Sequence, residues 1–377
     1  MAWFKKVEQR SEFIVPRELL SPGTFADVPV TVETSLRLSS VWACVRLLAD
    51  TVSTLPVDVY RDGKEIARPV VLDQPAAGWS LVEWVYCTMV SLLLRGNAYG
   101  LITARSGPRL SPAQVELVNP DDVTVQVNAN GSLTWRYKGR EIDPDDLWHV
   151  RAYCYPGQPE GLSPIAYAAE TIALGLATQR FGRQFFSEGA SPSGILSSES
   201  NLSADDVNLA KTKLIGATHG KREPLVVGGG AVTWQAMSIA PEESQFVESR
   251  KLGVAEIART FGVPPEMIGG EAGNSLTYAT VEGRATDFVR YSLSPWMIRL
   301  EQAIGTLLPR GQTVKFNPNA LLRGTTKERY EAHAIALASG FLTVDEVREL
   351  EDLPPMPADA KRVSPLPALQ AVDGGAS

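Results

Sequence analysis

The sequence predicts an α+β protein in which a mixed region of helices and strands is followed by long helices around a small inserted module. Three observations carry this prediction. Two segments with alternating apolar residues are joined by Asn130-Gly131, a strong signal for a β-hairpin. Two long helical patterns follow, over 163–189 and 241–262. Between them, residues 190–240 divide into short segments in the order β-α-β-β.

The chain before this hairpin is expected to begin irregularly and then to form helices. Prolines interrupt every pattern in residues 1–34. Ser39 or Ser40 is expected to cap a helix over about 41–55. A second helix, over about 81–95, is apolar nearly all round and should be deeply buried.

Strands are expected next to these helices. Asp62-Gly63 predicts the turn of a short hairpin, and residues 98–150 contain several strand patterns. The alternating segments are Val123–Val127 and Leu133–Tyr137, and a further strand is expected at about 146–150. The region before residue 163 is therefore expected to be a mixed domain of helices and strands.

The two long helices have clear start and stop signals. Ser163-Pro164 places a capping residue and a proline where a helix begins, and the pattern continues to Glu188 before Gly189. The second helix begins at about Pro241, with acidic residues in its first turn, and ends at Gly262.

A glycine-rich segment follows the second helix. Pro264-Pro265 prevent the helix from continuing, and three glycines lie within Gly269–Asn274. A further long helix is expected from about Thr280, with a kink or a break at Pro295. Such a mobile loop between two long helices could be presented to a molecule that moves past it.

The last part of the sequence predicts two more helices and a tail. They are expected at about 326–339 and 343–350, the second beginning with a capping box at Thr343. Residues 358–377 are rich in alanine, proline and glycine and are expected to be disordered.

The composition limits the function classes. With 44% hydrophobic residues and a formal net charge of -7, the 377 residues can form real cores but not a broad basic surface for nucleic acid. No signal peptide is expected, and the longest apolar stretch is too short for a membrane span. The three cysteines, Cys44, Cys87 and Cys154, are expected to be reduced and buried.

No set of residues with catalytic spacing is evident. Residues 216–222 resemble a phosphate-binding loop but are one residue short between the glycines, and Arg222 stands where Ser or Thr is needed. The histidines, His149, His219 and His333, are scattered, and the acidic pairs lie at turns and helix starts. We therefore expect no enzyme activity, no cofactor and no metal.

Several segments together resemble a known family, the portal proteins of long-tailed double-stranded DNA bacteriophages. Their order and spacing over about residues 35–355 carry the resemblance, more than any segment alone. The matching segments are VWACVRLLADTVSTLPVDVYR at 41–61, LLRGNAYGLI at 93–102, GLSPIAYAAETIALGLATQRFGRQFFSEGASPSGIL at 161–196, FGVPPEMIGG with NSLTYATVEG within 261–283, and LTVDEVRELEDLPP at 342–355.

The resemblance implies a subunit divided into named parts, which assembles with copies of itself, typically as a dodecameric ring. After the arm 1–34, the parts are the wing 35–162, the first stem helix 163–189, the clip 190–240, the second stem helix 241–262, the tunnel loop with a long kinked helix 263–309, the crown 310–357 and the disordered tail 358–377.

The resemblance also implies where the protein acts. The ring would occupy one vertex of the capsid in the virion, after synthesis in the cytoplasm of the bacterial host, with the major capsid protein around it and no membrane involved. The terminase large subunit would dock on it and drive double-stranded DNA through the ring without sequence specificity. A head-tail adaptor would later replace the terminase, and DNA would leave through the ring.

Two sets of residues are candidate sites under this interpretation. The DNA-facing tunnel loop contains no Lys or Arg, which suits a channel that must not hold phosphates: Gly269, Gly270, Glu271, Ala272, Gly273, Asn274, Ser275, Leu276 and Thr277. The clip carries local positive charge that could contact a docking partner: Lys211, Lys213, Lys221 and Arg222.

Two other classes of function stay open at this stage. The chain could be another structural protein of the head or of the head–tail junction, such as an adaptor or a minor capsid protein. It could also be an enzyme of DNA packaging, although such an enzyme needs a phosphate loop or a carboxylate–metal cluster.

Overall fold

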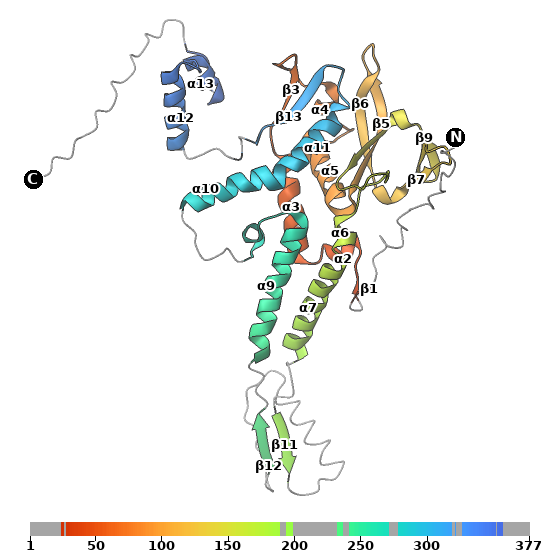
Figure 1. The fold of residues 1–377 in the computed structure, drawn as a ribbon, viewed down its shortest axis with the longest axis vertical. Helices are drawn as coiled ribbons and strands as arrows, with labels where there is room; N and C mark the ends of the chain where they lie inside the picture. The colour runs from red at the N-terminus through yellow and green to blue at the C-terminus, as the bar shows by residue number, and fades with distance from the viewer. Residues whose placement is uncertain are drawn as a thin grey trace, which may run out of the picture. The chain divides into compact units, whose positions relative to one another are not determined.

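The computed structural model describes most of the chain as two compact units, one up to Pro318 and one from Asn319 (Figure 1). The residues described are 24–25, 28–188, 194–198, 232–236, 241–270, 278–318, 321, 326–351 and 353–356. Within these ranges, no helix is both long and apolar enough to cross a membrane.

The described part of the first unit contains three antiparallel sheets of three strands each and two helices that pack together. Its elements up to the first stem helix are β1 Thr24–Phe25, β2 Val28–Pro29, α2 Val32–Ser35, α3 Ser39–Ser53, β3 Val57–Arg61, β4 Lys64–Ile66, α4 Val70–Asp73, α5 Leu81–Arg95, β5 Asn97–Ser106, β6 Ser111–Val118, η1 Pro120–Asp122, β7 Val123–Val127, β8 Leu133–Tyr137, β9 Arg140–Ile142, η2 Pro144–Asp146 and β10 Leu147–Arg151. The sequence predicted that residues 1–34 are irregular, but the described part of this range contains β1, β2 and the start of α2. A capping box between Thr31 and Thr34 begins α2.

The helices α3 and α5 form the centre of the main core. They pack together, and the buried side chains include Leu48, Trp84 and Leu92. The bounds of α5 confirm the prediction, since Gly96 ends it in the left-handed conformation with φ 73°. The predicted cap of α3 is wrong: Leu38 is the N-cap, without a side-chain hydrogen bond, and both serines lie in the first turn.

Two sheets of the first unit share a second, smaller core. The order β10-β5-β6 forms one sheet, and β7-β8-β9 forms another. Tyr99, Val123 and Trp135 are buried between them. The hairpin β7–β8 is confirmed, but its turn is longer than predicted, since Asn128 N donates to Ser132 O at 2.9 Å and only Gly131 adopts a positive φ.

The predicted first stem helix begins at a point fixed by several contacts. Ser163 caps α6 Pro164–Tyr167 by accepting a hydrogen bond from Ala166 N at 3.2 Å, and its own hydroxyl donates to Leu94 O at 2.7 Å. Asn97 accepts a bond from Gly161 N at 2.6 Å and donates one to Gly161 O at 2.8 Å. The start of the stem is thereby attached to the end of α5.

The first stem helix is divided, where the sequence predicted one continuous helix. Ala168 separates α6 from α7 Ala169–Glu188, with φ -93° and ψ 10°. The second stem helix, α9 Pro241–Phe261, agrees with its predicted range and packs against both α7 and α3 (Figure 1). Ile172, Ala173, Ile257 and Ala258 are buried, so the two helices are anchored in the main core.

The long helix after the glycine-rich segment is continuous but changes its pitch. It consists of α10 Tyr278–Asp287, the π-helical turn η4 Phe288–Leu293 and α11 Ser294–Gly305. Ser294 N donates to Val289 O, five residues back. This π-helical turn lies directly before Pro295, which has no N–H to donate. The kink or break that the sequence predicted at Pro295 is therefore a change of helical pitch in the structure.

A strand that the sequence analysis did not predict closes this unit. The strand β13 Gln312–Phe316 pairs antiparallel with β3, giving the sheet order β13-β3-β4. Glu301 on α11, only 8% exposed, accepts hydrogen bonds from Phe316 N and Lys315 Nζ at 2.9 Å. Residues 310–318 therefore belong to the first compact unit, whereas the sequence analysis had grouped them with the later helices in the range 310–357.

Of the inserted module, the structure describes one antiparallel pair. It consists of β11 Gly194–Ser198 and β12 Val232–Ala236, which confirms two of the predicted strands. The predicted helix after residue 203 and the strand at 224–227 lie outside the described residues.

The second unit contains the predicted helical pair. Its helices are α12 Thr326–Ser339 and α13 Val344–Leu350, and the capping box between Thr343 and Glu346 is confirmed. Arg329 Nη2 donates to Glu351 Oε2 at 2.9 Å, and His333 Nε2 lies 3.0 Å from Glu351 Oε1. These contacts join the two helices.

Candidate functional site: the chain around residues 262–278

The chain enters the candidate site through a rigid helix end. Gly262 closes α9 with φ 66°, and Val263 N donates back to Ala258 O at 2.9 Å. The short 3₁₀ helix η3 Pro265–Ile268 follows directly. The two prolines thus redirect the chain within a few residues and do not only stop the helix.

Gly269 and Gly270 belong to this turn. Gly269 has φ 86°, and Gly270 N donates to Pro265 O at 2.7 Å. A Cβ atom at Gly270 would lie 2.7 Å from Pro265 O, closer than such contacts normally allow. The sequence analysis placed both glycines in a flexible loop. In the structure, glycine is required at position 269 because of the positive φ, and at position 270 because a Cβ atom would not fit.

The chain leaves the site through α10, which begins at Tyr278, close to the expected Thr280. Two polar contacts connect this helix and the next turn to the entry side. Arg284 Nη1 lies 3.1 Å from Glu266 Oε1, and Ser292 Oγ donates to Gly262 O at 2.5 Å. The two ends of the segment 271–277 are therefore held together, although they are separate in sequence.

Sequence reasoning missed Glu266, Arg284 and Ser292. The signal was weak: opposite charges 18 residues apart, on either side of a turn, do not indicate a contact unless the path of the chain is known. Of the predicted tunnel-loop residues, the structure describes Gly269 and Gly270. The others, Glu271 to Thr277, lie outside the described residues, as do Lys211, Lys213, Lys221 and Arg222 of the inserted module.

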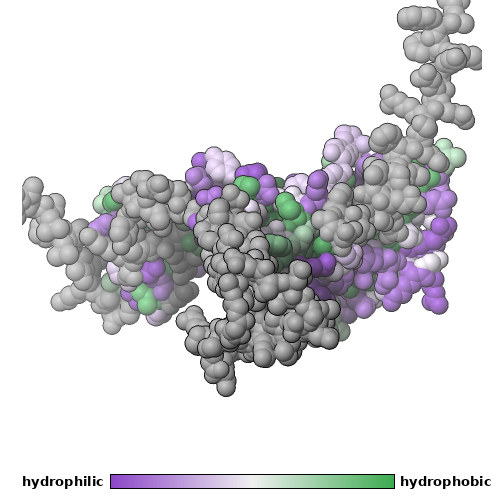
Figure 2. All heavy atoms as spheres, turned by 90° about the horizontal axis from the view of Figure 1, so that it is seen from below, coloured by the Kyte–Doolittle hydropathy of each residue, from purple (hydrophilic) through white to green (hydrophobic). Residues whose placement is uncertain are grey.

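The predicted stem helices, α7 and α9, expose apolar side chains in the single chain. Leu174 is 59% exposed on α7, and Val247 and Leu252 are 50% and 59% exposed on α9. Figure 2 shows, on the described part of one face of the molecule, apolar side chains that reach the surface among polar ones. Fully burying one such side chain contributes about 1.5–3 kcal/mol of free energy. The exposed apolar side chains of α7 and α9 therefore favour association with another protein surface.

One histidine with a strongly shifted pKa, His149, lies outside this segment, on β10. Burial, and to a lesser degree Arg151, lowers the pKa of His149 to about 3, and its ring stacks on Tyr99 with centroids 4.3 Å apart. His149 lies on β10 and pairs with Tyr99 of β5 in the same sheet. Within the described ranges no cluster of His, Cys, Asp and Glu could hold a metal ion. Cys154 is exposed, contrary to the expectation of burial.

Comparison with solved structures defines the fold class. The fold is similar to a chain in the neck of an empty gene transfer agent (GTA) particle computed with C6 symmetry, with a TM-score of 0.64 and 23% identity over 86% of this chain and 94% of that chain. It is also similar to a chain in the neck of a native GTA particle computed with C12 symmetry, with a TM-score of 0.62 and 23% identity over 90% of this chain and 95% of that chain. An HK97 family phage portal protein from Corynebacterium diphtheriae also matches (TM-score 0.56, 19% identity, 78% of this chain and 96% of that chain). At these identities the likeness shows the fold, which is that of a portal subunit.

Sequence comparison identifies the family. A family model described as Phage portal protein matches residues 39–352. A probable portal protein of Streptomyces phage phiC31 is 35% identical over 358 residues, 87% of this chain and 77% of the phage protein. The portal protein of Enterobacteria phage HK97 is 27% identical over 359 residues, 89% of this chain and 83% of its own length. The chain belongs to the phage portal protein family, which confirms the resemblance seen in the sequence.

Proposed function

We propose that this chain is the subunit of a closed portal ring at one vertex of a capsid, through which double-stranded DNA enters and leaves. Membership of the portal family over residues 39–352 is the observation that carries the proposal. A portal protein is a structural component of the particle, and the proposed role needs no catalytic group of its own. The GTA neck structures, computed with C6 and C12 symmetry, support a ring of twelve copies.

The stem supports ring closure. The helices α7 and α9 are anchored at one end by Ile172 and Ile257, while Leu174 and Leu252 are exposed in the single chain. In a ring, copies related by rotation would cover such side chains through heterologous contacts that close on themselves. These contacts would make the stem the main contact between subunits.

The segment Gly269–Thr277 is the proposed DNA-facing loop. It contains one charged residue, Glu271, and no Lys or Arg. Each phosphate that a cation neutralises adds salt-dependent affinity, so a passage without cations lets DNA slide. The Glu266–Arg284 ion pair holds the two flanks of the loop together, which would leave the residues between them to move against the DNA.

The inserted module 190–240 is the proposed docking end for the terminase large subunit and later for a head-tail adaptor. Its lysines and Arg222 are the proposed contacts. Replacing Lys221 and Arg222 by alanine should weaken attachment of the motor or adaptor and leave the ring intact. Unchanged packaging and unchanged tail joining in this variant would contradict the docking role.

The whole proposal is tested by particle assembly. Particles made with the wild-type protein should contain the ring at a single vertex, next to the major capsid protein, as seen by electron microscopy with a tag on the second unit. Particles made without it should contain no packaged DNA. Full heads without the protein would contradict a portal function, and ATP hydrolysis by the purified protein alone would favour a packaging enzyme.

A further inference from the structure

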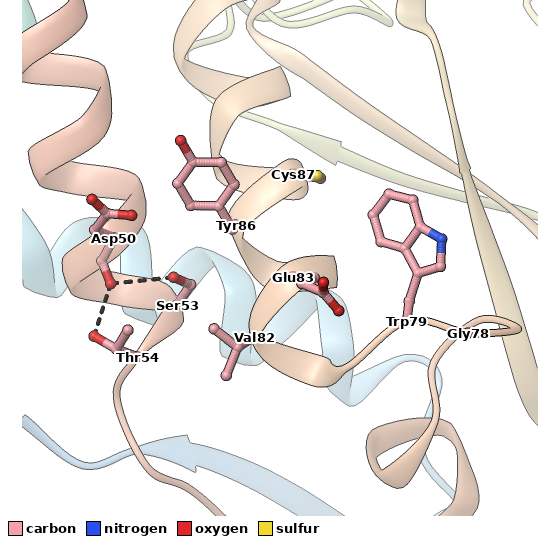
Figure 3. Close-up of a pocket in the computed structure, with 9 residues that line it drawn as sticks. All are labelled: Asp50, Ser53, Thr54, Gly78, Trp79, Val82, Glu83, Tyr86 and Cys87. Atoms are coloured by element: carbon pink, nitrogen blue, oxygen red, sulfur yellow. Dashed lines mark hydrogen bonds between the residues drawn. The ribbon is translucent and has the colours of Figure 1, made fainter.

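A pocket of about 380 Å³ lies between the C-terminal end of α3 and the first half of α5 (Figure 3). Its lining includes Asp50 from α3, Trp79 from the loop before α5, and Val82, Glu83, Tyr86 and Cys87 from α5. The site lies in the first unit, on helices whose other faces form the main core, so the pocket walls are rigid.

The pocket exposes apolar surface that none of the described residues covers. Trp79 is 40% exposed and Val82 is 47% exposed, although both lie beside a concave site. Figure 3 shows Tyr86 and Val82 on the side of α5 that faces α3, with Trp79 beside the start of the helix. A concave, mostly apolar site with aromatic walls suits an aromatic side chain.

The rim of the pocket is negative. Asp50 and Glu83 line it, and no Lys or Arg does. Asp50 lies in the last turn of α3, where the helix dipole adds to the negative potential. Glu83 is fixed by hydrogen bonds from Ser80 N and Ser80 Oγ at 2.9 and 2.7 Å. Arg46, one turn before Asp50 on the same helix, is exposed and is not part of the lining, and its charge partly opposes that of Asp50 at Tyr86.

Outside the described residues, one segment places aromatic residues directly beside cations. Trp3-Phe4 is followed directly by Lys5-Lys6, so two aromatic rings precede two cations. The other candidate, the tail 358–377, has Lys361 and Arg362 but no aromatic residue. An aromatic pocket with a negative rim therefore favours the first segment.

The first segment can also reach the pocket. The described chain begins at Thr24 in β1, which packs against α7, and α7 meets the start of α3 where Gly175 faces Leu38. The pocket lies at the other end of α3, about 22 Å away at 1.5 Å per residue. About twenty extended residues span up to roughly 65 Å, which is more than enough.

We propose that the pocket between α3 and α5 binds the Trp3–Lys6 segment of this chain, with an aromatic side chain against Trp79 and Val82 and the lysines beside Asp50 and Glu83. The same geometry permits the segment to come from its own copy or from an adjacent copy in an assembly. In either case the contact attaches the first residues of the chain to the wing.

Cys87 provides a direct measurement, because it lines the pocket while Cys154 is exposed and Cys44 is buried. We expect the Trp3→Ala/Phe4→Ala variant of the full chain to show alkylation of Cys87 by a maleimide about fivefold faster than wild type, since thiol reactivity follows access. Cys154 and Cys44 should react as in wild type. Lys5→Glu/Lys6→Glu should give a smaller increase in the same direction, and Lys361→Glu/Arg362→Glu is the matched control without an effect.

A photo-cross-linking amino acid at position 4 tests the contact without removing it. Peptide mapping should place the cross-links on α3 and α5 around the pocket, within one chain or between two copies. An unchanged Cys87 rate in the Trp3→Ala/Phe4→Ala variant, together with cross-links elsewhere, would overturn the proposal. So would faster Cys87 alkylation in the Lys361→Glu/Arg362→Glu variant, because the tail would then be the occupant.

Discussion

The guanidinium of Arg284 lies 3.1 Å from the carboxylate of Glu266, and this contact joins the two flanks of the segment 271–277. Both side chains are between a quarter and a third exposed, at 29% and 27%. The pair is therefore only partly screened by water. It connects η3, which follows the second stem helix, to α10, which begins the long helix behind the loop.

Removing this ion pair should loosen both flanks of the loop. We expect Glu266→Gln and Arg284→Gln to show a coupling of about 1 kcal/mol in a double-mutant cycle of unfolding free energy, the range of partly exposed pairs. Amide exchange over residues 278–287 should be faster in either single variant. Equal exchange in the variants and in wild type would show that the pair does not hold α10 in place.

Gly270 should not tolerate a side chain, because its Cβ would lie 2.7 Å from Pro265 O. We expect Gly270→Ala to lower the free energy of unfolding by about 1–3 kcal/mol through overpacking. Gly283→Ala in the exposed part of α10 is the matched control, since no atom lies within 4 Å of its Cβ position. The control should raise stability by up to about 1 kcal/mol, the helix propensity difference. Chemical denaturation of both variants would show whether the free energy of unfolding falls in Gly270→Ala and rises in Gly283→Ala.

A cation in the loop should slow DNA. We expect Asn274→Lys to leave the ring intact and to shorten the packaged DNA, because each copy in the ring would add a phosphate contact. Asn274→Gln is the control for size without charge. Full-length genomes in particles carrying the lysine variant, with rings confirmed by microscopy, would show that the segment does not face DNA.

The partly buried imidazole of His149 should make stability depend on pH. Its pKa falls from the usual 6.5 to about 3 on folding, so the unfolded chain binds the proton more tightly. The stability that the neutral imidazole contributes is fully present above about pH 6.5. It is lost as the pH falls toward 3, at up to about 1.4 kcal/mol per pH unit. His149→Phe keeps a ring against Tyr99 and cannot titrate, although it also removes the 2.9 Å contact between His149 Nε2 and Asn97 Oδ1 at every pH. Denaturation between pH 7 and pH 4 should therefore show a shallower loss in the variant, and parallel curves would contradict this assignment.

Much of the fold could be predicted from local signals. The bounds of α5 follow from its apolar pattern and from Gly96, and the hairpin of β3 and β4 follows from Asp62-Gly63, both of which have a positive φ. The capping box at Thr343 likewise marks the start of α13. In each case the residues that determine the structure are neighbours in the sequence.

The missed features depend on contacts between distant residues. The strand β13 forms because residues 312–316 pair with 57–61, and its own pattern is short. Ala168 carries no signal for the break between α6 and α7. At the candidate site, Gly262 and the prolines were visible in the sequence. The bonds from Arg284 to Glu266 and from Ser292 to Gly262 were not, because they arise only when the chain folds back.

The central claim is that copies of this chain form a closed ring through their stem helices, and electron microscopy of the purified protein tests it most directly. The account predicts rings of twelve copies, with α7 and α9 in contact between neighbours, and predicts that Leu252→Glu abolishes the rings while Glu248→Gln, on the same helix, does not. Monomers of the wild-type protein under particle-assembly conditions, or intact rings in the Leu252→Glu variant, would contradict it.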